Sequence, residues 1–266
     1  MTMRSHTGSS AASWLVAAVI ALSSAAPASA QQQARVFISV NGGLQATSSN
    51  FSQDIVFPES GGLYRDVLSA ATAQESARFE SAYRVESGML FDVSGGVRLA
   101  RNFGLGIGVS QFAANESASV SAQVPHPFFF DRDRSISGTL PLPRNERAFH
   151  LEARVMVPAT EAVTVTVFGG PTAFSVWQQL VTDVRFSQEY PYETASFTSA
   201  DRSQEFGTTV GYHLGADVAY YFSSNVGIGW FLRYSRAMVE LPSGSDGTLD
   251  TQAGGLHTAG GLRLRF

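Results

Sequence analysis

The chain has 266 residues, of which 44% are apolar and 15% charged, and its formal charge is -4. This composition excludes an intrinsically disordered chain, which would hold more charge and fewer aromatic residues than the 11% found here. The lack of cysteine excludes disulfides and thiolate metal sites. The negative charge argues against a nucleic-acid-binding protein, because such proteins present a basic face.

The first thirty residues show the three regions of a secretory signal peptide. A positive charge at Arg4 precedes a short apolar run at 14–22, and residues 28–30 form the small-x-small cleavage site Ala-Ser-Ala. The apolar run is too short for a transmembrane helix, which needs about 20 apolar residues. We therefore expect a signal peptide at 1–30 and a single exported domain at 31–266.

Beyond residue 31 the sequence shows the period-two alternation that is typical of β-strands. Along 149–157, for example, apolar side chains alternate with His150, Glu152 and Arg154. The same alternation recurs at 35–46, 103–109, 163–167, 210–222, 226–235 and 256–266. The domain is therefore predicted to be built from strands.

The connections between these strands fall into two length classes. Three are short, at about 101–102, 159–161 and 223–225, and four are long, at roughly 47–86, 113–146, 179–206 and 240–250. Together they join eight strands, and short turns at one end with long loops at the other are typical of an outer-membrane β-barrel. Residues 76–86 could extend the second strand or add a hairpin, so a barrel of ten strands is the alternative.

The two faces of the predicted sheet differ in chemistry. One face consists almost entirely of Val, Ile, Leu, Phe and Tyr. The other face holds Asp92, Arg98, His150, Glu152, Arg154, His213, Asp217, Arg233, His257, Arg263 and Arg265. In a membrane barrel the apolar face meets lipid and the charges line the lumen, whereas a soluble sandwich would turn its apolar face inward.

The export signal, the two classes of connection and the terminal Phe266 favour the barrel. Aromatic residues also lie where strands would end at a membrane interface: Phe103, Trp177, Tyr220 and Phe222. We therefore predict an all-β chain that forms a transmembrane, antiparallel, up-and-down barrel of eight strands in the outer membrane of a Gram-negative bacterium. Eight strands enclose an interior that side chains can fill.

The last segment, GGLRLRF at 260–266, resembles the terminal strand of bacterial outer-membrane barrels. The resemblance implies that Leu262, Leu264 and Phe266 form the signal read by the barrel-assembly machinery, although Leu264 stands where such strands usually carry an aromatic residue. Segments 91–110, 123–138 and 215–237 resemble an uncharacterised family of outer-membrane β-barrel sequences from environmental Gram-negative bacteria. More distantly, the layout resembles the small OmpA, OmpX and OmpW barrels. These resemblances imply a location and a fold but no activity.

The inward charges predict a filled lumen. Five arginines face three acids, and buried charges are costly unless they are paired and hydrogen bonded. A salt-bridged plug is therefore expected, and the alternative is a narrow path that prefers anions because arginine is in excess.

Three inward histidines, His150, His213 and His257, could bind a metal or act as acid and base. They lie on strands that are not adjacent, and barrel shear shifts equal positions to different heights. We therefore expect separate, hydrogen-bonded histidines, with no metal, cofactor or catalytic site. The sequence also contains no G-x-S-x-G nucleophile motif.

Phe128, Phe129 and Phe130 follow His126, which lies between two prolines in the second long connection. Three exposed phenylalanines would favour aggregation. We expect them to pack over the barrel mouth or at the outer membrane interface. The alternative is that they grip an apolar ligand or a partner surface.

The function predicted from the sequence is that of a non-enzymatic outer-membrane barrel with an envelope-structural or surface-interaction role. One alternative is a narrow passive channel for small apolar or anionic solutes. Another is an envelope enzyme that uses the lumenal histidines and acids. The expected partners are membrane lipid and the assembly machinery, with no nucleic acid and with a small-molecule ligand left unidentified.

Overall fold

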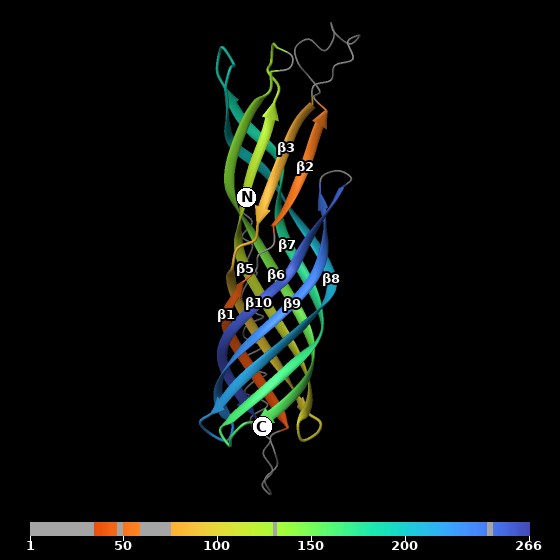
Figure 1. Ribbon diagram of the computed structural model, residues 1–266, viewed down its shortest axis with the longest axis vertical. Helices are drawn as coiled ribbons and strands as arrows, with labels where there is room; N and C mark the ends of the chain where they lie inside the picture. The colour runs from red at the N-terminus through yellow and green to blue at the C-terminus, as the bar shows by residue number, and fades with distance from the viewer. Residues whose placement is uncertain (1–34, 47–49, 59–75, 130–131, 244–246) are drawn as a thin grey trace, which may run out of the picture. The chain divides into compact units, whose positions relative to one another are not determined.

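The computed structural model describes residues 35–46, 50–58, 76–129, 132–243 and 247–266. The expected signal peptide at 1–30 lies outside the described residues. Within them the chain forms strands joined by turns (Figure 1). No helix in this part of the chain is long and apolar enough to cross a membrane.

The ten strands of the described residues follow one another along the chain (Figure 1). They are β1 (Val36–Ala46), β2 (Asn50–Pro58), β3 (Ser76–Arg84), β4 (Gly88–Arg98), β5 (Phe103–Val124), β6 (Arg134–Pro158), β7 (Val163–Gln188), β8 (Ala195–Tyr221), β9 (Val226–Ser243) and β10 (Gly247–Arg265).

Eight of these strands close into a ring. Its order is β5-β4-β1-β10-β9-β8-β7-β6, and β6 pairs back with β5. The first and last strands of the chain pair antiparallel from Phe37 opposite Arg265 to Ala46 opposite Leu256. The prediction of an antiparallel, up-and-down ring of eight strands is therefore confirmed.

The three short connections were also predicted correctly. Tight turns join β4 to β5, β6 to β7 and β8 to β9, and all three lie at the end of the ring where the carboxyl terminus also lies (Figure 1). We call this the turn end of the ring.

The segment at 76–86 extends the barrel instead of enlarging the ring. β2 pairs with β3, and β3 pairs with residues 117–123 of β5, beyond the stretch of β5 that pairs with β4. β3 and β4 are thus consecutive parts of one strand path that is interrupted at 85–87.

The prediction of long loops is wrong for the segments 113–146, 179–206 and 240–250, because strands fill most of each. Of the first predicted loop, 47–86, residues 50–58 and 76–84 form strands, and residues 47–49 and 59–75 lie outside the described residues. β5 runs to Val124 and β6 begins at Arg134, β7 runs to Gln188 and β8 begins at Ala195, and β9 runs to Ser243 and β10 begins at Gly247. β5 to β8 have 22 to 27 residues each, about twice the 9–11 that cross a membrane. The outward side chains become polar beyond the membrane, so the sequence there loses the apolar face expected of a lipid-facing strand.

Near the turn end, the outer surface of the ring is an apolar belt. Twelve of its outward side chains are between 45% and 76% exposed: Leu44, Met89, Phe91, Leu105, Ile107, Phe149, Leu151, Val210, Leu214, Ile228, Trp230 and Leu256. An apolar band of this kind faces lipid in a membrane barrel.

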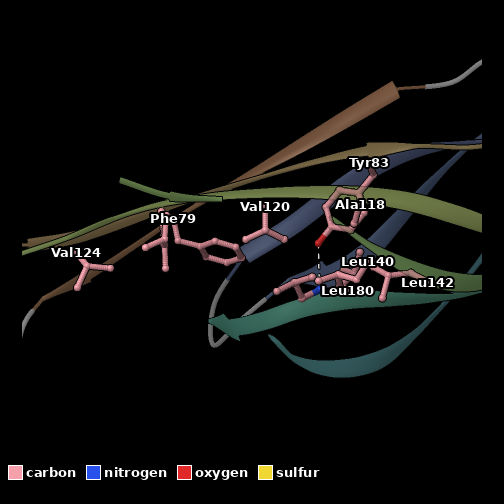
Figure 2. Close-up of a cluster of buried hydrophobic side chains, with 11 residues drawn as sticks. Phe79, Tyr83, Ala118, Val120, Val124, Leu140, Leu142 and Leu180 are labelled. Carbon is pink, nitrogen blue, oxygen red and sulfur yellow. Dashed lines mark hydrogen bonds between the residues drawn. The ribbon is translucent and has the colours of Figure 1, made fainter. Parts of the chain in front are cut away.

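Beyond the belt lies a second part, the extension, formed by 50–58, 76–84, 115–124, 134–143 and 179–205. Here the pairing of β6 with β7 ends at Arg144 opposite Gln178, and β5 and β6 continue as one sheet with β2 and β3. The β7–β8 hairpin packs against that sheet over a buried apolar cluster (Figure 2). The cluster contains Phe79, Tyr83, Ala118, Val120, Ala122, Val124, Ile136, Leu140, Leu142, Leu180 and Val181. The extension is thus apolar inside and polar outside, as in a water-soluble β-sandwich.

Candidate functional site

Three salt bridges lie in the lumen of the ring, and two of them join different strands. The three join Arg233 to Asp92, Arg154 to Glu152 and Arg263 to Asp217. The Arg233 Nη1 atom lies 2.8 Å from the nearer Asp92 oxygen, and both side chains are at most 3% exposed. Arg154 and Glu152 pair along β6, whereas the other two salt bridges join β9 to β4 and β10 to β8. The lumen therefore pairs these buried charges, as buried charges require.

Nine of the eleven predicted lumenal residues are buried, and the other two are half-buried near the turn end. Arg98 directs its Nη2 atom to the sulfur of Met156 at 3.7 Å. Arg265 donates to the Ser224 carbonyl at 2.7 Å, and its guanidinium lies 3.8 Å from the centre of the Tyr221 ring. Neither has a carboxylate partner among the salt bridges of the described residues.

The expectation that shear would keep the histidines apart is wrong for two of them. His150 on β6 and His213 on β8 have ring centroids 4.8 Å apart. The Thr172 hydroxyl on β7 bridges them, at 2.9 Å from His150 Nδ1 and 2.8 Å from His213 Nδ1. The strand between them therefore supplies the group that links them.

His257 is held separately from the other two histidines. Its Nδ1 atom lies 3.0 Å from Arg233 Nη2, and its Nε2 atom lies 3.0 Å from the Ser235 hydroxyl. No group of three or more His, Asp or Glu among the described residues has the geometry of a metal site.

Hydroxyl and imidazole groups lie within hydrogen-bond reach of each other in the lumen, as in a nucleophile–base pair. The Ser110 hydroxyl is 3.0 Å from His150 Nε2. Both side chains are at most 3% exposed. The cavity among the neighbouring lumenal side chains has a volume of about 10 Å³, which is room for roughly one water molecule. This arrangement holds side chains in place and leaves little room for a substrate.

A second polar network, which the sequence analysis missed, closes the ring where the extension begins. At its centre is Arg144, which is 0% exposed. Arg144 donates to Glu146 at 2.8 Å, to Glu116 at 3.3 Å, to the Thr251 hydroxyl at 3.2 Å and to the Gln252 carbonyl at 2.7 Å. It also donates to the Gln178 amide oxygen at 3.3 Å. A single guanidinium thus connects β5, β6, β7 and β10.

Both carboxylates of this network have further donors. Glu116 accepts from the Gln178 amide at 2.7 Å. Glu146 accepts from the Gly254 backbone N–H at 3.0 Å and from the Gln45 amide at 3.3 Å. Burial raises the pKa of Glu116, and the positive charge of Arg144 opposes that rise. The even-numbered residues of β6 from His150 to Met156 face inward. Continuing the same alternation toward the start of the strand would have identified Glu146 and Arg144 as inward-facing residues.

The residues of the predicted assembly signal lie on the outer side of the last strand. Leu262 and Phe266 are 41% and 40% exposed, and Leu264 is half-buried. Leu262 pairs with Val40, and Leu264 pairs with Ile38 of β1. Recognition of these three residues by the assembly machinery stays a prediction.

The aromatic residues predicted for the membrane interfaces lie at two heights. Phe103, Tyr220, Phe222 and Phe266 are exposed at the turn end of the ring. Trp177 lies on the outer face of β7 at the other border of the belt, beside the first residues of the extension.

The phenylalanine cluster was expected at the barrel mouth or at the membrane interface. The structure places its described residues elsewhere. Phe128 and Phe129 lie in the connection between β5 and β6, at the far end of the extension, and are 57% and 52% exposed. Phe130 lies outside the described residues. The expectation failed because β5 and β6 continue as strands well past the belt.

At this far end, the β5–β6 and β7–β8 connections form one surface, which we call the tip. The Phe128 ring lies 5.5 Å from the Tyr192 ring, and Tyr192 lies 6.0 Å from Tyr190. Tyr190 is 85% exposed. The buried His126 accepts the backbone N–H groups of Phe128 and Phe129 on its Nδ1 atom, at 3.1 and 3.2 Å.

Comparison with known proteins gives no match to any family model and no match to a curated protein. Solved structures that are similar include the outer membrane protein OprG from Pseudomonas aeruginosa, with 10% identity over 88% of this chain and 97% of that chain and a TM-score of 0.42. Neisserial surface protein A (NspA) has 11% identity over 87% and 97%, with a TM-score of 0.40. The outer membrane protease OmpT from Escherichia coli has 8% identity over 87% and 97%, with a TM-score of 0.44.

These similarities are weak, and the fold rests on the strand pairing itself. The chain forms a closed antiparallel ring with an apolar outer belt, a charged lumen and short turns at one end. This is the architecture of an outer-membrane β-barrel, with lipid against the belt.

Proposed function

We propose that this protein is a closed, non-enzymatic outer-membrane barrel that holds a rigid binding surface away from the membrane. The observation that carries the proposal is the tip, where two connections are tied together and present exposed aromatic rings at the end of the extension. Aromatic side chains are prominent among the residues that contribute most to binding at protein interfaces.

The tip is preorganised by buried polar contacts. Arg134, which is 7% exposed, donates to the Gln188 amide oxygen at 2.7 Å, to the Tyr192 carbonyl at 2.9 Å and to the Pro125 carbonyl at 2.8 Å. These bonds hold the β5–β6 connection against the β7–β8 connection. Rigidity of this kind lowers the entropy that a surface loses when it binds.

The filled interior supports a role without solute passage. Cross-strand salt bridges occupy the lumen near the turn end, the Arg144 network follows, and the apolar cluster of the extension lies beyond it. A solute would have to displace paired, buried charges, each of which costs several kcal/mol when it is left alone. Conductance measurement distinguishes this proposal from a narrow passive channel.

The first experiment reconstitutes the purified protein in planar bilayers. We expect no current steps above those of protein-free membranes, because the salt-bridged layers are closed. Steady ohmic conductance by the wild-type protein would overturn the closed-barrel proposal and would support the channel alternative.

The second experiment tests the tip directly. Cells that display the protein are applied to a glycan array and to immobilised collagen, fibronectin and mucin, and are compared with cells that display the triple variant Phe128→Ser, Phe129→Ser, Tyr190→Ser. The matched control changes Ser119 and Thr139, which are exposed on the side of the extension, to Ala. We expect a bound probe to be lost with the tip variant and kept with the control. Equal binding by all three proteins, or no binding to any probe, would overturn the role of the tip.

A further inference from the structure

Three outward-facing side chains form a platform on neighbouring strands of the ring. The Arg147 guanidinium on β6 lies 5.1 Å from the centre of the Trp177 ring on β7. The Trp177 ring lies 5.0 Å from that of Phe206 on β8, at an interplanar angle of 41°. Trp177 and Phe206 are direct register partners, so the platform is continuous across three strands.

The height of the platform is fixed by its neighbours along each strand. On β6, Phe149 is 57% exposed within the apolar belt, and Asn145 follows on the same face on the other side of Arg147. On β8, Val210 is 73% exposed within the belt, and Phe206 is 49% exposed. The platform therefore spans the border at which the apolar belt ends and the polar extension begins.

This border faces the exterior of the cell. Outer-membrane barrels have their short turns in the periplasm and their longer segments outside, and the platform lies at the end of the belt farther from the turn end. Aromatic rings at such a border lie at the level of the lipid headgroups. In a Gram-negative outer membrane, the headgroups of the outer leaflet are phosphorylated sugars.

Arg147 is exposed, and its register partners in the described part of the chain carry no carboxylate. Its register partners on the two adjacent strands are Gln111 and Ser175, and Ser175 in turn faces Thr208. None of the salt bridges among the described residues includes Arg147. The guanidinium thus lies against an aromatic ring, and its N–H groups have no acidic partner within the residues that the structure describes.

We propose that the Arg147–Trp177–Phe206 platform binds the phosphate-bearing headgroup of an outer-leaflet glycolipid. The guanidinium matches the geometry of a phosphate and binds it with two parallel hydrogen bonds. The rings of Trp177 and Phe206 pack against the sugar and the first acyl carbons, where one side of the ligand is polar and the other apolar. The site lies on the barrel wall and is independent of what the tip binds.

Arg236 supplies the matched control. It is an exposed, outward-facing arginine on β9, opposite Tyr212 and Gly254. None of the cation–ring contacts in the described residues involves it. Replacement of Arg236 removes the same charge from the same wall without touching a ring platform.

The experiment measures lipid binding to the full-length protein in detergent micelles by native mass spectrometry. The probes are bisphosphorylated lipid A, the same lipid after removal of both phosphates, and inorganic phosphate alone. We expect Arg147→Gln to weaken binding of phosphorylated lipid A by about tenfold, the size of effect that follows from losing a charged hydrogen bond. Arg236→Gln should bind phosphorylated lipid A with the affinity of the wild type. Dephosphorylated lipid A should bind the wild type weakly, with an affinity similar to that of phosphorylated lipid A for Arg147→Gln.

Three outcomes would overturn the proposal. Equal affinity of the wild type and Arg147→Gln would show that the guanidinium does not take part. Equal weakening in Arg147→Gln and Arg236→Gln would show a general attraction of charge. Competition by millimolar inorganic phosphate would show a bare anion site without recognition of the lipid.

A folding control accompanies these measurements. Because all three side chains face outward, each variant should keep the shift in gel mobility on heating that marks a folded barrel. If Arg147→Gln fails this control, Trp177→Leu removes the platform while the charge is kept, and it should weaken lipid A binding in the same direction. Unchanged binding by Trp177→Leu would also refute the site.

Discussion

Replacement of Arg144 by Met tests the buried network that closes the ring beneath the extension. Methionine keeps most of the volume of the side chain but removes its charge and its donors. The wild-type guanidinium donates to two carboxylates, to the Gln178 amide oxygen, to the Thr251 hydroxyl and to one backbone carbonyl. All of these bonds are lost together in Arg144→Met.

The expected loss of stability follows from the burial of the two acids left behind. Glu116 and Glu146 are at most 3% exposed, and removing one partner of a buried ion pair costs about 3–5 kcal/mol. Glu116 keeps its bond from Gln178, and Glu146 keeps its bond from the Gly254 N–H. Because these donors remain, we expect a loss near the lower end, about 3 kcal/mol at neutral pH.

The loss should depend on pH with a definite sign. Glu116 lies beyond the apolar belt, and burial raises its pKa above the ordinary 4.5 even while Arg144 opposes the shift. A carboxyl group with a raised pKa holds its proton more tightly in the folded state, so stability falls as the pH rises from about 4.5 through the folded value. Without Arg144 the pKa of Glu116 rises further. The variant should therefore recover part of its stability on acidification from pH 7 to pH 5.

The assay is urea unfolding of the protein in phosphatidylcholine vesicles, followed by tryptophan fluorescence. Arg147→Met is the control, because it makes the same change three residues away on the outer face and should alter stability by no more than about 0.5 kcal/mol. In the triple variant Glu116→Gln, Arg144→Met, Glu146→Gln, removal of the uncompensated charges should restore part of the loss. Two results would refute this reasoning. One is that Arg144→Met has the same free energy of unfolding as Arg147→Met. The other is that Arg144→Met recovers no stability at acidic pH.

Three further predictions concern the extension. Tyr83→Phe should cost about 1–3 kcal/mol in urea unfolding, because the Tyr83 hydroxyl accepts the buried Val181 N–H at 3.0 Å; an unchanged midpoint would contradict this. Gly138→Ala should destabilise the extension by about 1–3 kcal/mol, because an added Cβ would lie 2.3 Å from the Phe197 ring; protease resistance equal to wild type would argue against that contact. Arg134→Ala should speed proteolysis of the tip by about tenfold while the ring stays intact, and an unchanged cleavage rate would show that other contacts hold the tip.

Local alternation is enough to predict which side chains face the lumen. Alternation is local, because successive residues of a strand point to opposite faces wherever the strand runs. The inward phase of β6 at His150, Glu152 and Arg154 could thus be read directly, and all three are buried in the structure. The short turns, the closed order of the strands and the location of the belt followed from the same pattern.

The strands of the extension could not be recognised from the alternation of apolar and polar residues. In the belt the outward face is apolar, whereas in the extension the outward face is polar and the inward face is apolar. Along β5 this change separates the outward Val109 from the outward Ser119. The polar residues of such a strand are the same as those of a loop, and only pairing with a neighbouring strand distinguishes the two.

Which inward side chains meet depends on the folded ring and not on any one strand. Shear sets the relative heights of neighbouring strands, and it depends on the register of the whole ring. That register brings His150, Thr172 and His213 together and places Arg144 of β6 against Glu116 of β5. It also joins Arg147 to Trp177 on the outer wall. The alternation along one strand therefore predicts the face on which a side chain lies, and the register of the closed ring determines which side chains it contacts.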